Sequence, residues 1–85
     1  MTENTEHEQA VEELTLLLLY LTSWEEELLR GAPTVRRAWK NMRFEVLDSL
    51  AQQGHLETKH RAKSVHITED GAEKARELQE KYLGS

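Results

Sequence analysis

The sequence predicts a small, mainly α-helical domain with one β-hairpin, in the order helix, helix, helix, hairpin, helix. Apolar residues recur at three- and four-residue steps through 9–29, as they do along one face of a helix. Apolar and polar residues alternate within 55–59 and again within 64–68, as in two half-buried strands. Two acidic residues then follow Thr68, where the dipole of a closing helix would favour them.

Length and composition narrow the class of protein. The chain has 85 residues, which predicts one domain over 9–83 after a disordered polar tail over 1–8. It contains no cysteine, so a disulfide framework or a thiolate metal site is excluded. The start lacks the basic and apolar regions of a secretory signal, and the apolar run Leu14–Leu21 is too short to cross a bilayer. We therefore expect a cytoplasmic protein that does not contact a membrane.

The first predicted helix, 9–29, has two apolar sides. Its main stripe should face the core and consists of Val11, Leu14, Leu17, Leu18, Leu21, Trp24 and Leu28. Three further large side chains, Leu16, Leu19 and Tyr20, fall on the other side. A surface helix rarely exposes three such residues, so this side either packs within the chain or forms a homodimer interface. The sequence leaves both options open.

A short second helix and a longer third helix are expected next. Gly31 and Pro33 should end the first helix, and a helix over 34–40 should follow. This short helix would bury Val35, Ala38 and Trp39 and expose Arg36, Arg37 and Lys40. Asn41 could cap the third helix, 42–53, which ends at Gly54 and buries Phe44, Leu47, Leu50 and Ala51.

The hairpin has a definite expected register. Pairing Leu56 with Ile67 and Thr58 with Val65 places every apolar side chain of both strands on one face. The same register places Glu57 opposite His66 on the other face. Thr68 should then cap the last helix. An all-helical bundle with an irregular hairpin is the other topology that the pattern permits.

Charge is distributed unevenly along the chain, whose net charge is −5. Residues 1–29 hold eight acids and no Lys or Arg, whereas residues 30–66 hold eight bases and three acids. Residues 67–85 are again acidic, with five acids and three bases. A basic segment between two acidic segments can direct an anionic partner to one face of a protein.

The chain resembles winged helix-turn-helix regulators, because three helices followed by a hairpin and a closing helix is their plan. More closely, it is similar to an uncharacterised family of small bacterial proteins that look winged-helix-like. The matching motifs are TLLLLYLT at 15–22, RAWK at 37–40, LDSLAQQG at 47–54 and AKSVHITEDG at 62–71. This family has no established activity, so the resemblance predicts the fold more than the function.

The winged-helix resemblance implies binding to double-stranded DNA, with the third helix in the major groove and the hairpin beside the backbone. The candidate contact residues are Arg36, Arg37, Lys40, Arg43, Gln52, Gln53, Lys59, Arg61 and Lys63. Glu45 and Asp48 depart from this pattern, since carboxylates on a recognition helix repel phosphate. A homodimer through Leu16, Leu19 and Tyr20 would present two such faces. The alternative is a winged-helix protein-interaction module that does not bind DNA.

Other kinds of site have weaker support. Trp24, Trp39 and Phe44 could stack on bases, but core packing is the expected role because each lies on an apolar stripe. The histidines do not have the spacing of a metal site. The chain has neither a nucleophile elbow nor a glycine-rich phosphate loop. We therefore expect no enzymatic activity, no cofactor and no small-molecule ligand.

Overall fold

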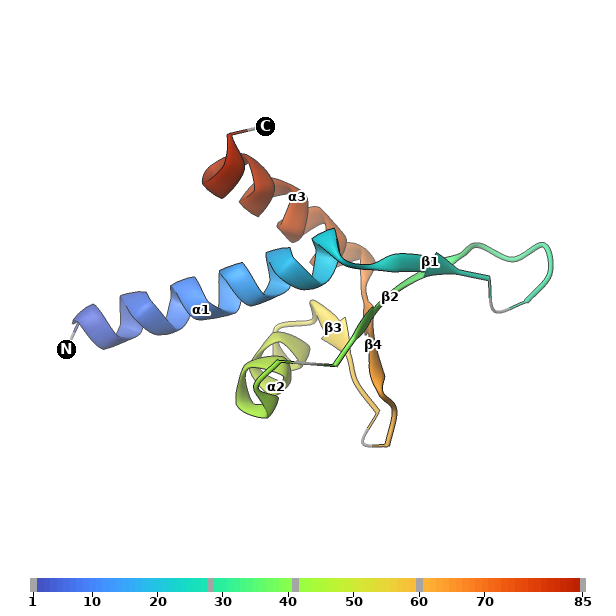
Figure 1. Ribbon diagram of the computed structural model, residues 1–85, viewed down its shortest axis with the longest axis horizontal. Coiled ribbons are helices and arrows are strands. Elements are labelled where there is room, and N and C mark those ends of the chain that lie inside the picture. Colours follow the sequence, from blue (N-terminus) through green and yellow to red (C-terminus); the bar gives the residue numbers. More distant parts are fainter. Residues whose placement is uncertain (1, 28, 41, 60, 85) are drawn as a thin grey trace.

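The computed structural model describes residues 2–27, 29–40, 42–59 and 61–84, with side chains from Glu6 onward. Within these residues the chain forms three helices and one four-stranded sheet, in the order α-β-β-α-β-β-α (Figure 1). Helix α1 spans Thr2–Leu21, α2 spans Phe44–Gln52 and α3 spans Glu69–Leu83. Strands β1 and β2 span Trp24–Glu26 and Val35–Trp39, and β3 and β4 span Leu56–Glu57 and Ser64–Ile67. The fold is therefore mixed α and β, with more sheet than a single hairpin.

The sheet is antiparallel throughout, in the strand order β1-β2-β4-β3. Leu56 pairs with Ile67 and Glu57 with His66, which confirms the expected hairpin register. Thr58 lies beyond the end of β3, so its expected pairing with Val65 does not form. Strand β2 lies between β1 and β4, so the segment expected to be the second helix is instead a central strand.

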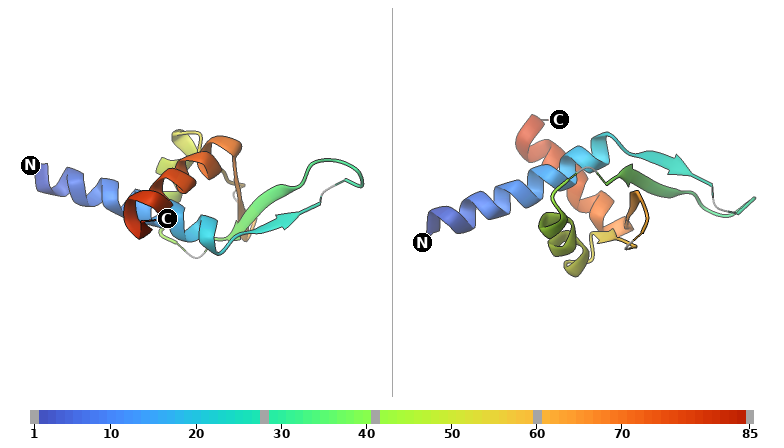
Figure 2. Two further views of the ribbon diagram at one scale, coloured as in Figure 1. Left: turned by 90° about the horizontal axis from the view of Figure 1, so that it is seen from above. Right: turned by 60° about the horizontal axis from the view of Figure 1, so that its bottom comes forward.

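The three helices pack on one face of the sheet and leave the other face open (Figure 2). Successive side chains of a strand point to opposite faces. Ala38, Leu56, Val65 and Ile67 point toward the helices and are at most 2 % exposed. They form one core with the buried helical residues, which are Leu16, Leu17, Leu19, Leu47, Leu50, Ala75 and Leu78. We call the open side the outward face of the sheet.

Helix α1 differs from the expected first helix at both ends. It begins at Thr2, so it includes the segment that we expected to be a disordered tail. It ends at Leu21 rather than near residue 29, because Thr22 and Ser23 donate hydroxyl hydrogen bonds to the carbonyls of Leu18 and Tyr20. Such side-chain bonds compete with the helical pattern. The chain then enters β1.

The expected helix over 34–40 is wrong, because β2 occupies 35–39. The pairing of β2 with both β1 and β4 satisfies its backbone hydrogen-bonding groups. A helix of only seven residues would be unstable unless other parts of the chain packed against it. Two consecutive helices therefore do not form before β3, and the expected helix-turn-helix is absent from the described part of 34–53. This is the main departure from the predicted order.

Helix α2 agrees with the third expected helix to within two residues at each end. Arg43 occupies its N-cap position without a side-chain capping bond, whereas Asn41, the expected cap, lies outside the described residues. Gly54 follows the C-cap with φ of +84°, which is the left-handed conformation that glycine adopts readily. Leu47 and Leu50 are buried as expected, but Phe44 is 58 % exposed. The expected core role of Phe44 is therefore wrong.

The start of α3 confirms the expected cap. The Thr68 hydroxyl accepts a hydrogen bond of 3.0 Å from the Gly71 amide and donates one of 2.6 Å to the Gly54 carbonyl. The Thr68 amide also donates to the His55 carbonyl. Through one residue, the start of α3 is thus joined to the turn after α2 and to the beginning of β3.

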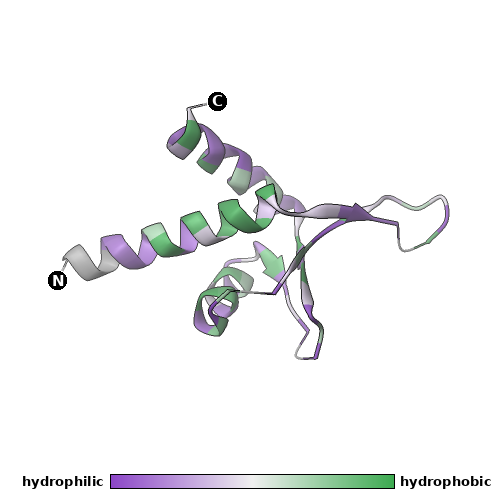
Figure 3. Cartoon of the chain, viewed as in Figure 1, coloured by the Kyte–Doolittle hydropathy of each residue, from purple (hydrophilic) through white to green (hydrophobic). Residues whose placement is uncertain are grey.

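Only part of the expected core stripe of α1 is buried, since Leu17 is 4 % exposed whereas its neighbours on the stripe are not covered. Leu16 and Leu19 are 0 % and 1 % exposed and pack inside the chain, and Tyr20 is half-buried against the same core. The sequence left packing within the chain and a homodimer interface both open for this side of α1, and Leu16 and Leu19 show the packing option. Four residues of the expected core stripe instead face solvent: Val11, Leu14, Leu18 and Leu21. Figure 3 shows more apolar residues along the C-terminal part of α1 than along α3. Among the described helices, none is long and apolar enough to cross a membrane.

Candidate functional site

The residues predicted to contact DNA do not form one surface. They lie in three places: on opposite faces of β2, along α2, and around the connection between β3 and β4. The difference follows from the strand at 35–39. A helix would have exposed Arg36, Arg37 and Lys40 on one side, whereas a strand alternates them between two faces.

Arg36 points toward the helices. Its guanidinium donates a 2.9 Å hydrogen bond to the Ser23 hydroxyl and forms a 3.3 Å ion pair with Glu25. It also lies 4.9 Å from the centre of the Tyr20 ring, within the range of a cation–π contact. These contacts connect the end of α1 to β1 and β2. Arg36 therefore supports the fold and does not reach the outward face.

Arg37 lies on the outward face, but its charge is already balanced. Its Nε donates a 3.1 Å hydrogen bond to the Ser64 hydroxyl and lies 3.5 Å from a carboxylate oxygen of Glu26. Its side chain is 23 % exposed. Arg37 thus presents a fixed guanidinium edge on the outward face and adds little net charge.

The predicted residues of α2 belong to a separate surface. Arg43 forms a 3.7 Å ion pair with Glu45, and both side chains are more than three-quarters exposed. Gln53 donates a 2.6 Å hydrogen bond to Glu12 of α1, so its amide is engaged in packing two helices. Gln52 is exposed next to it. Glu45 on this surface opposes an approach of phosphate groups.

Four bases gather where β2 ends beside the connection between β3 and β4. Lys40 donates a 2.8 Å hydrogen bond from its ammonium group to the Lys59 carbonyl, and its amide donates one of 2.8 Å to the Lys63 carbonyl. Lys59, Arg61 and Lys63 are exposed, and none forms an ion pair within the described part of the chain. We call these four residues the basic end of the sheet.

Two tryptophans lie on the outward face beside the basic end. Trp39 pairs with Ser64 across the sheet and is 60 % exposed. Trp24 on β1 contacts it, with ring centres 4.9 Å apart and ring planes tilted by 44°. The expected core role of Trp39 is wrong, because β2 directs Ala38 inward and Trp39 outward. Trp24 is half-buried. The strand-forming pair Val35 and Trp39 was the sequence signal that could have revealed this arrangement.

A cleft continues this surface toward β3. It has a volume of about 210 Å³ and is lined by Arg37, Glu57, Lys59, Ala62, Ser64 and His66. The expected pair of Glu57 and His66 is formed, with 3.0 Å between a carboxylate oxygen and Nδ1. The cleft therefore places hydrogen-bond donors and two basic side chains beside one carboxylate, next to the exposed face of Trp39.

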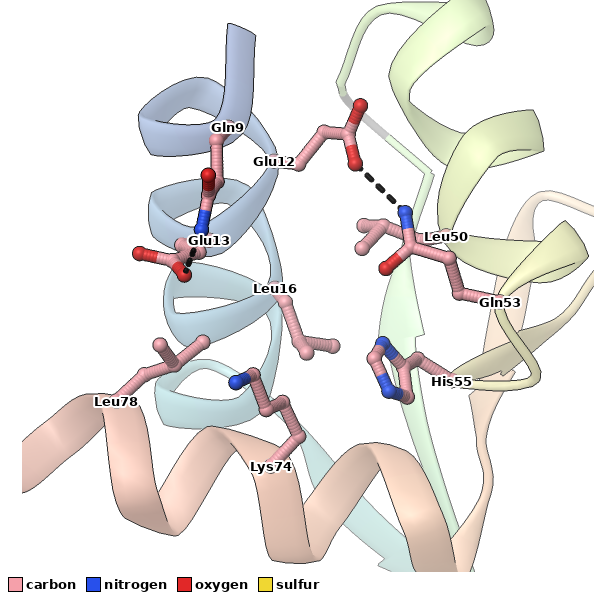
Figure 4. A pocket seen from close by; sticks show the side chains of 9 residues that line it. All are labelled: Gln9, Glu12, Glu13, Leu16, Leu50, Gln53, His55, Lys74 and Leu78. Atoms are coloured by element: carbon pink, nitrogen blue, oxygen red, sulfur yellow. Dashed lines mark hydrogen bonds between the residues drawn. The ribbon is translucent and has the colours of Figure 1, made fainter. Parts of the chain in front are cut away.

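A second pocket lies between α1, α2 and α3 (Figure 4). Gln53, His55 and Lys74 meet Leu16 in this pocket of about 210 Å³, and the buried Nδ1 of His55 has no partner among the described residues. Glu12 and Glu13 also line it. Because carboxylates share the pocket with an ammonium group, its charges do not favour one class of ligand.

The carboxylate of Glu13 is held ionised beside this pocket. It accepts hydrogen bonds from the Tyr82 hydroxyl at 2.7 Å, from Lys81 at 2.9 Å and from Gln9 at 3.2 Å. These donors, Tyr82 foremost, lower the pKa of Glu13 from an ordinary value of 4.5 to about 2, although partial burial opposes the change. This network fastens the end of α3 to α1. No three His, Asp or Glu side chains of the described segments lie close enough together to hold a metal ion.

Comparison with known proteins adds one finding. Neither curated proteins nor solved structures gave a match to the chain. Residues 7–85 match a family described as a domain of unknown function, DUF6429. The match covers nearly the whole chain and includes all the helices and strands except the first residues of α1. The chain therefore belongs to the DUF6429 family.

Proposed function

We propose that the outward face of the sheet binds single-stranded nucleic acid, with Trp39 stacking on a base and the basic end contacting phosphates. The observation that carries this proposal is the position of Trp39. It is 60 % exposed on an open sheet face, and the next residue, Lys40, pairs through its amide with the Lys63 carbonyl at the end of the sheet. Proteins that bind single strands without strong sequence preference combine these two features, a stacking aromatic and a basic path for the backbone.

The exposed tryptophan is positioned before any ligand arrives. Trp24 supports one part of the Trp39 ring at a centre-to-centre distance of 4.9 Å, which limits the conformations that Trp39 adopts in the free protein. A side chain that is already ordered loses less entropy on binding. Stacking of one base on an aromatic side chain contributes about 1–3 kcal/mol, which corresponds to about a 5- to 150-fold change in affinity.

The charge around Trp39 is locally favourable although the chain is acidic overall. Glu26 is paired with Arg37 and Glu57 with His66, so both carboxylates of the outward face already have partners. Lys59, Arg61 and Lys63 are exposed and form no ion pair with another described residue, so we expect them to contact phosphate oxygens. The acids of 1–29, apart from Glu25 and Glu26, lie on α1 or beyond β1.

This proposal keeps only part of the winged-helix mode of binding. The β3–β4 hairpin, the paired strand β2 and the capped α3 correspond to the hairpin half of that plan, and the hairpin would still contact the nucleic-acid backbone. The helix that would position α2 in a major groove is replaced by β2. For this reason we propose contact through the sheet, and we assign no base contact to Arg43, Gln52 or Gln53.

Fluorescence titration tests the proposal, since both tryptophans of the chain lie on the proposed surface. A mixed-sequence single-stranded oligonucleotide should quench their emission, and Trp39→Ala should weaken binding by about 5- to 150-fold. Phe44→Ala is the control, because it removes another exposed aromatic side chain, from α2. Competition with duplex DNA of the same sequence should be weak. Tighter binding to the duplex would favour the major-groove alternative, and no binding at low salt would contradict the proposal.

Salt dependence tests the basic end separately. The affinity of wild type should fall with rising salt, and Lys59→Ala/Lys63→Ala should reduce the slope of log K against log[salt] by about 1.4 for two lost phosphate contacts. Arg30→Ala/Arg76→Ala is the control, because it changes the net charge by the same amount at two positions away from the basic end, in the β1–β2 loop and in α3. Equal effects of the two double variants would show that only net charge matters and would contradict this site.

A protein-interaction module is the second candidate function. One observation favours it, namely the row of apolar side chains that α1 exposes to solvent. This row lies on a different element from Trp39 and the basic end, so both functions are compatible with one chain.

A further inference from the structure

Four apolar side chains form a continuous row along the solvent side of α1. Val11, Leu14 and Leu18 are each 47 % exposed, and Leu21 is 49 % exposed. Their spacing of three, four and three residues keeps them on one side of the helix, opposite Leu16. We call these four residues the α1 stripe. Contiguous apolar surface of this kind on a small protein indicates an interaction site.

The α1 stripe is not an incompletely covered part of the chain's own core. The other side of the same helix already packs Leu16 and Leu19, which are fully buried. Two carboxylates on that inner side, Glu12 and Glu13, are bound by Gln53, Lys81 and Tyr82 from the other helices. Helix α1 thus binds Glu12 and Glu13 on its inner side and exposes its apolar row on the outer side.

We infer that the α1 stripe binds the α1 stripe of a second copy of this chain. The three-four-three spacing is that of a coiled-coil seam, in which two helices interlock a and d side chains. In such a pairing, Val11 and Leu18 occupy a positions and Leu14 and Leu21 occupy d positions. The row is self-complementary, as a twofold interface requires.

The charges of α1 favour a second copy of the chain over an anionic lipid surface as the partner of the α1 stripe. Helix α1 carries acids and no Lys or Arg, so two copies would repel if those acids flanked the seam. Along Leu14, Leu18 and Leu21 the flanking residues of the helix are instead neutral, namely Thr15 and Thr22, and charged residues (Glu8, Arg43 and Glu45) adjoin the α1 stripe at its Val11 end. A helix without basic residues is also poorly suited to an anionic lipid surface, which attracts Lys and Arg. A second uncharged apolar row is therefore the partner that fits.

The size of the seam predicts a weak dimer. From Val11 to Leu21 the helix rises by about 15 Å, so the seam has only three turns. Its total buried surface falls at the small end of specific interfaces, below about 1,200 Å². The dimer should therefore dissociate on dilution, and this inference does not depend on nucleic-acid binding.

Sedimentation equilibrium of the full chain over a range of concentrations tests the inference. The mass of wild type should rise from 9.9 kDa toward twice that value as the concentration increases. Leu14→Glu/Leu18→Glu should remain monomeric throughout, with an unchanged circular dichroism spectrum because both side chains face solvent. Leu29→Glu, a control at a side chain that is 71 % exposed in the β1–β2 loop, should dimerise like wild type. A monomeric wild type at every concentration, or an unaffected double variant, would overturn the inference.

Cross-linking gives a second measurement that does not depend on the orientation of the two helices. The chain has no cysteine, so Leu14→Cys/Leu18→Cys introduces the only thiols. A parallel pair brings position 14 beside 14 and an antiparallel pair brings 14 beside 18, and either forms an intermolecular disulfide on mild oxidation. Leu29→Cys should give far less covalent dimer under the same conditions. Equal yields from the two variants would show random collision and would contradict the seam.

Discussion

The carbonyl of His55 occupies the space that a side chain at Gly71 would need. A Cβ at position 71 would clash with the His55 backbone, because the first turn of α3 lies directly against the start of β3. Replacement of glycine by alanine inside a helix normally stabilises it by about 1 kcal/mol. We predict the opposite sign for Gly71→Ala, a loss of about 1–3 kcal/mol in the free energy of unfolding.

Urea denaturation followed by circular dichroism measures this change. Ala72→Gly, in the same turn, serves as the control and should cost about 0.5–1 kcal/mol as in an ordinary helix. A Gly71→Ala variant as stable as wild type would show that α3 does not pack this closely on β3.

The Glu13 network predicts a pH dependence of stability. The pKa of Glu13 is about 2 in the folded chain and near 4.5 without its partners. The stabilisation from Glu13 is therefore complete above about pH 4.5 and is lost as the pH falls toward 2. Glu13→Gln should lower the free energy of unfolding at pH 7 by about 1–2 kcal/mol, since hydrogen bonds to a charged group are lost.

Denaturation of both proteins at several pH values checks the sign. The two stabilities should converge as the pH falls through this window. Glu8→Gln, at an exposed position of the same helix, should show little difference from wild type at any pH. A constant gap between wild type and Glu13→Gln from pH 7 to pH 2 would exclude the network as its cause.

The opposite orientations of Arg36 and Arg37 separate stability from binding. Arg36→Ala should destabilise the chain by about 1 kcal/mol, because it removes the contacts with Tyr20, Ser23 and Glu25. The same change should leave the affinity for single-stranded nucleic acid within about twofold, or about 0.4 kcal/mol, because Arg36 does not reach the outward face.

Lys63→Ala should show the reverse, with reduced affinity and unchanged stability, because its side chain is exposed at the basic end. Denaturation measures the stability of both variants, and fluorescence titration measures their affinity for the oligonucleotide. If Arg36→Ala weakened binding as much as Lys63→Ala, the assignment of the two faces of β2 would be incorrect.

The Thr68 cap predicts a difference between two conservative substitutions. Thr68→Ala removes the hydroxyl that joins Gly54 to Gly71 and should cost about 1–2 kcal/mol. Thr68→Ser keeps the hydroxyl and should recover most of this loss. Thermal denaturation of the two variants measures the difference, and equal losses would indicate that the methyl group, not the hydrogen bonds, is responsible.

Local sequence signals predicted the C-terminal half of the fold well. The alternation in Leu56, Val65 and Ile67 set the hairpin register, and Thr68 set the start of α3. Both signals act between residues that are close in the chain, and each has a definite stereochemical meaning. The glycine after α2 was equally informative, because its left-handed conformation ends the helix at the predicted place.

The N-terminal half depended on contacts that the sequence does not display. In 34–40, Val35, Ala38 and Trp39 fit a short helix or a strand, and the pairing of β2 with β1 and β4 decides between them. In α1, both sides are apolar, so periodicity alone cannot tell which side is buried. Glu12 and Glu13 lie inside because Gln53, Lys81 and Tyr82 bind them from distant parts of the chain.

The predicted DNA-contact surface was wrong for the same reason, namely the helix expected over 34–40. The aromatic residue at 39 and the bases at 36 and 37 were assigned to the core and to one exposed face, as a helix would require. As a strand, β2 brings Trp39 and Arg37 to the outward face and turns Arg36 away from it. The bases of 59–63 were identified correctly as exposed because a polar hairpin connection faces solvent in either fold.

Strand β1 places charge on an open edge of the sheet. It lies at one end of the sheet, so one side of its backbone has no partner strand within the described chain. Two of its three residues are Glu25 and Glu26. Two molecules that joined at this edge would bring four carboxylates together, and charged residues on an edge strand oppose such growth of a sheet. The same two glutamates that balance Arg36 and Arg37 within one molecule thus act between molecules as a barrier to fibril-like assembly.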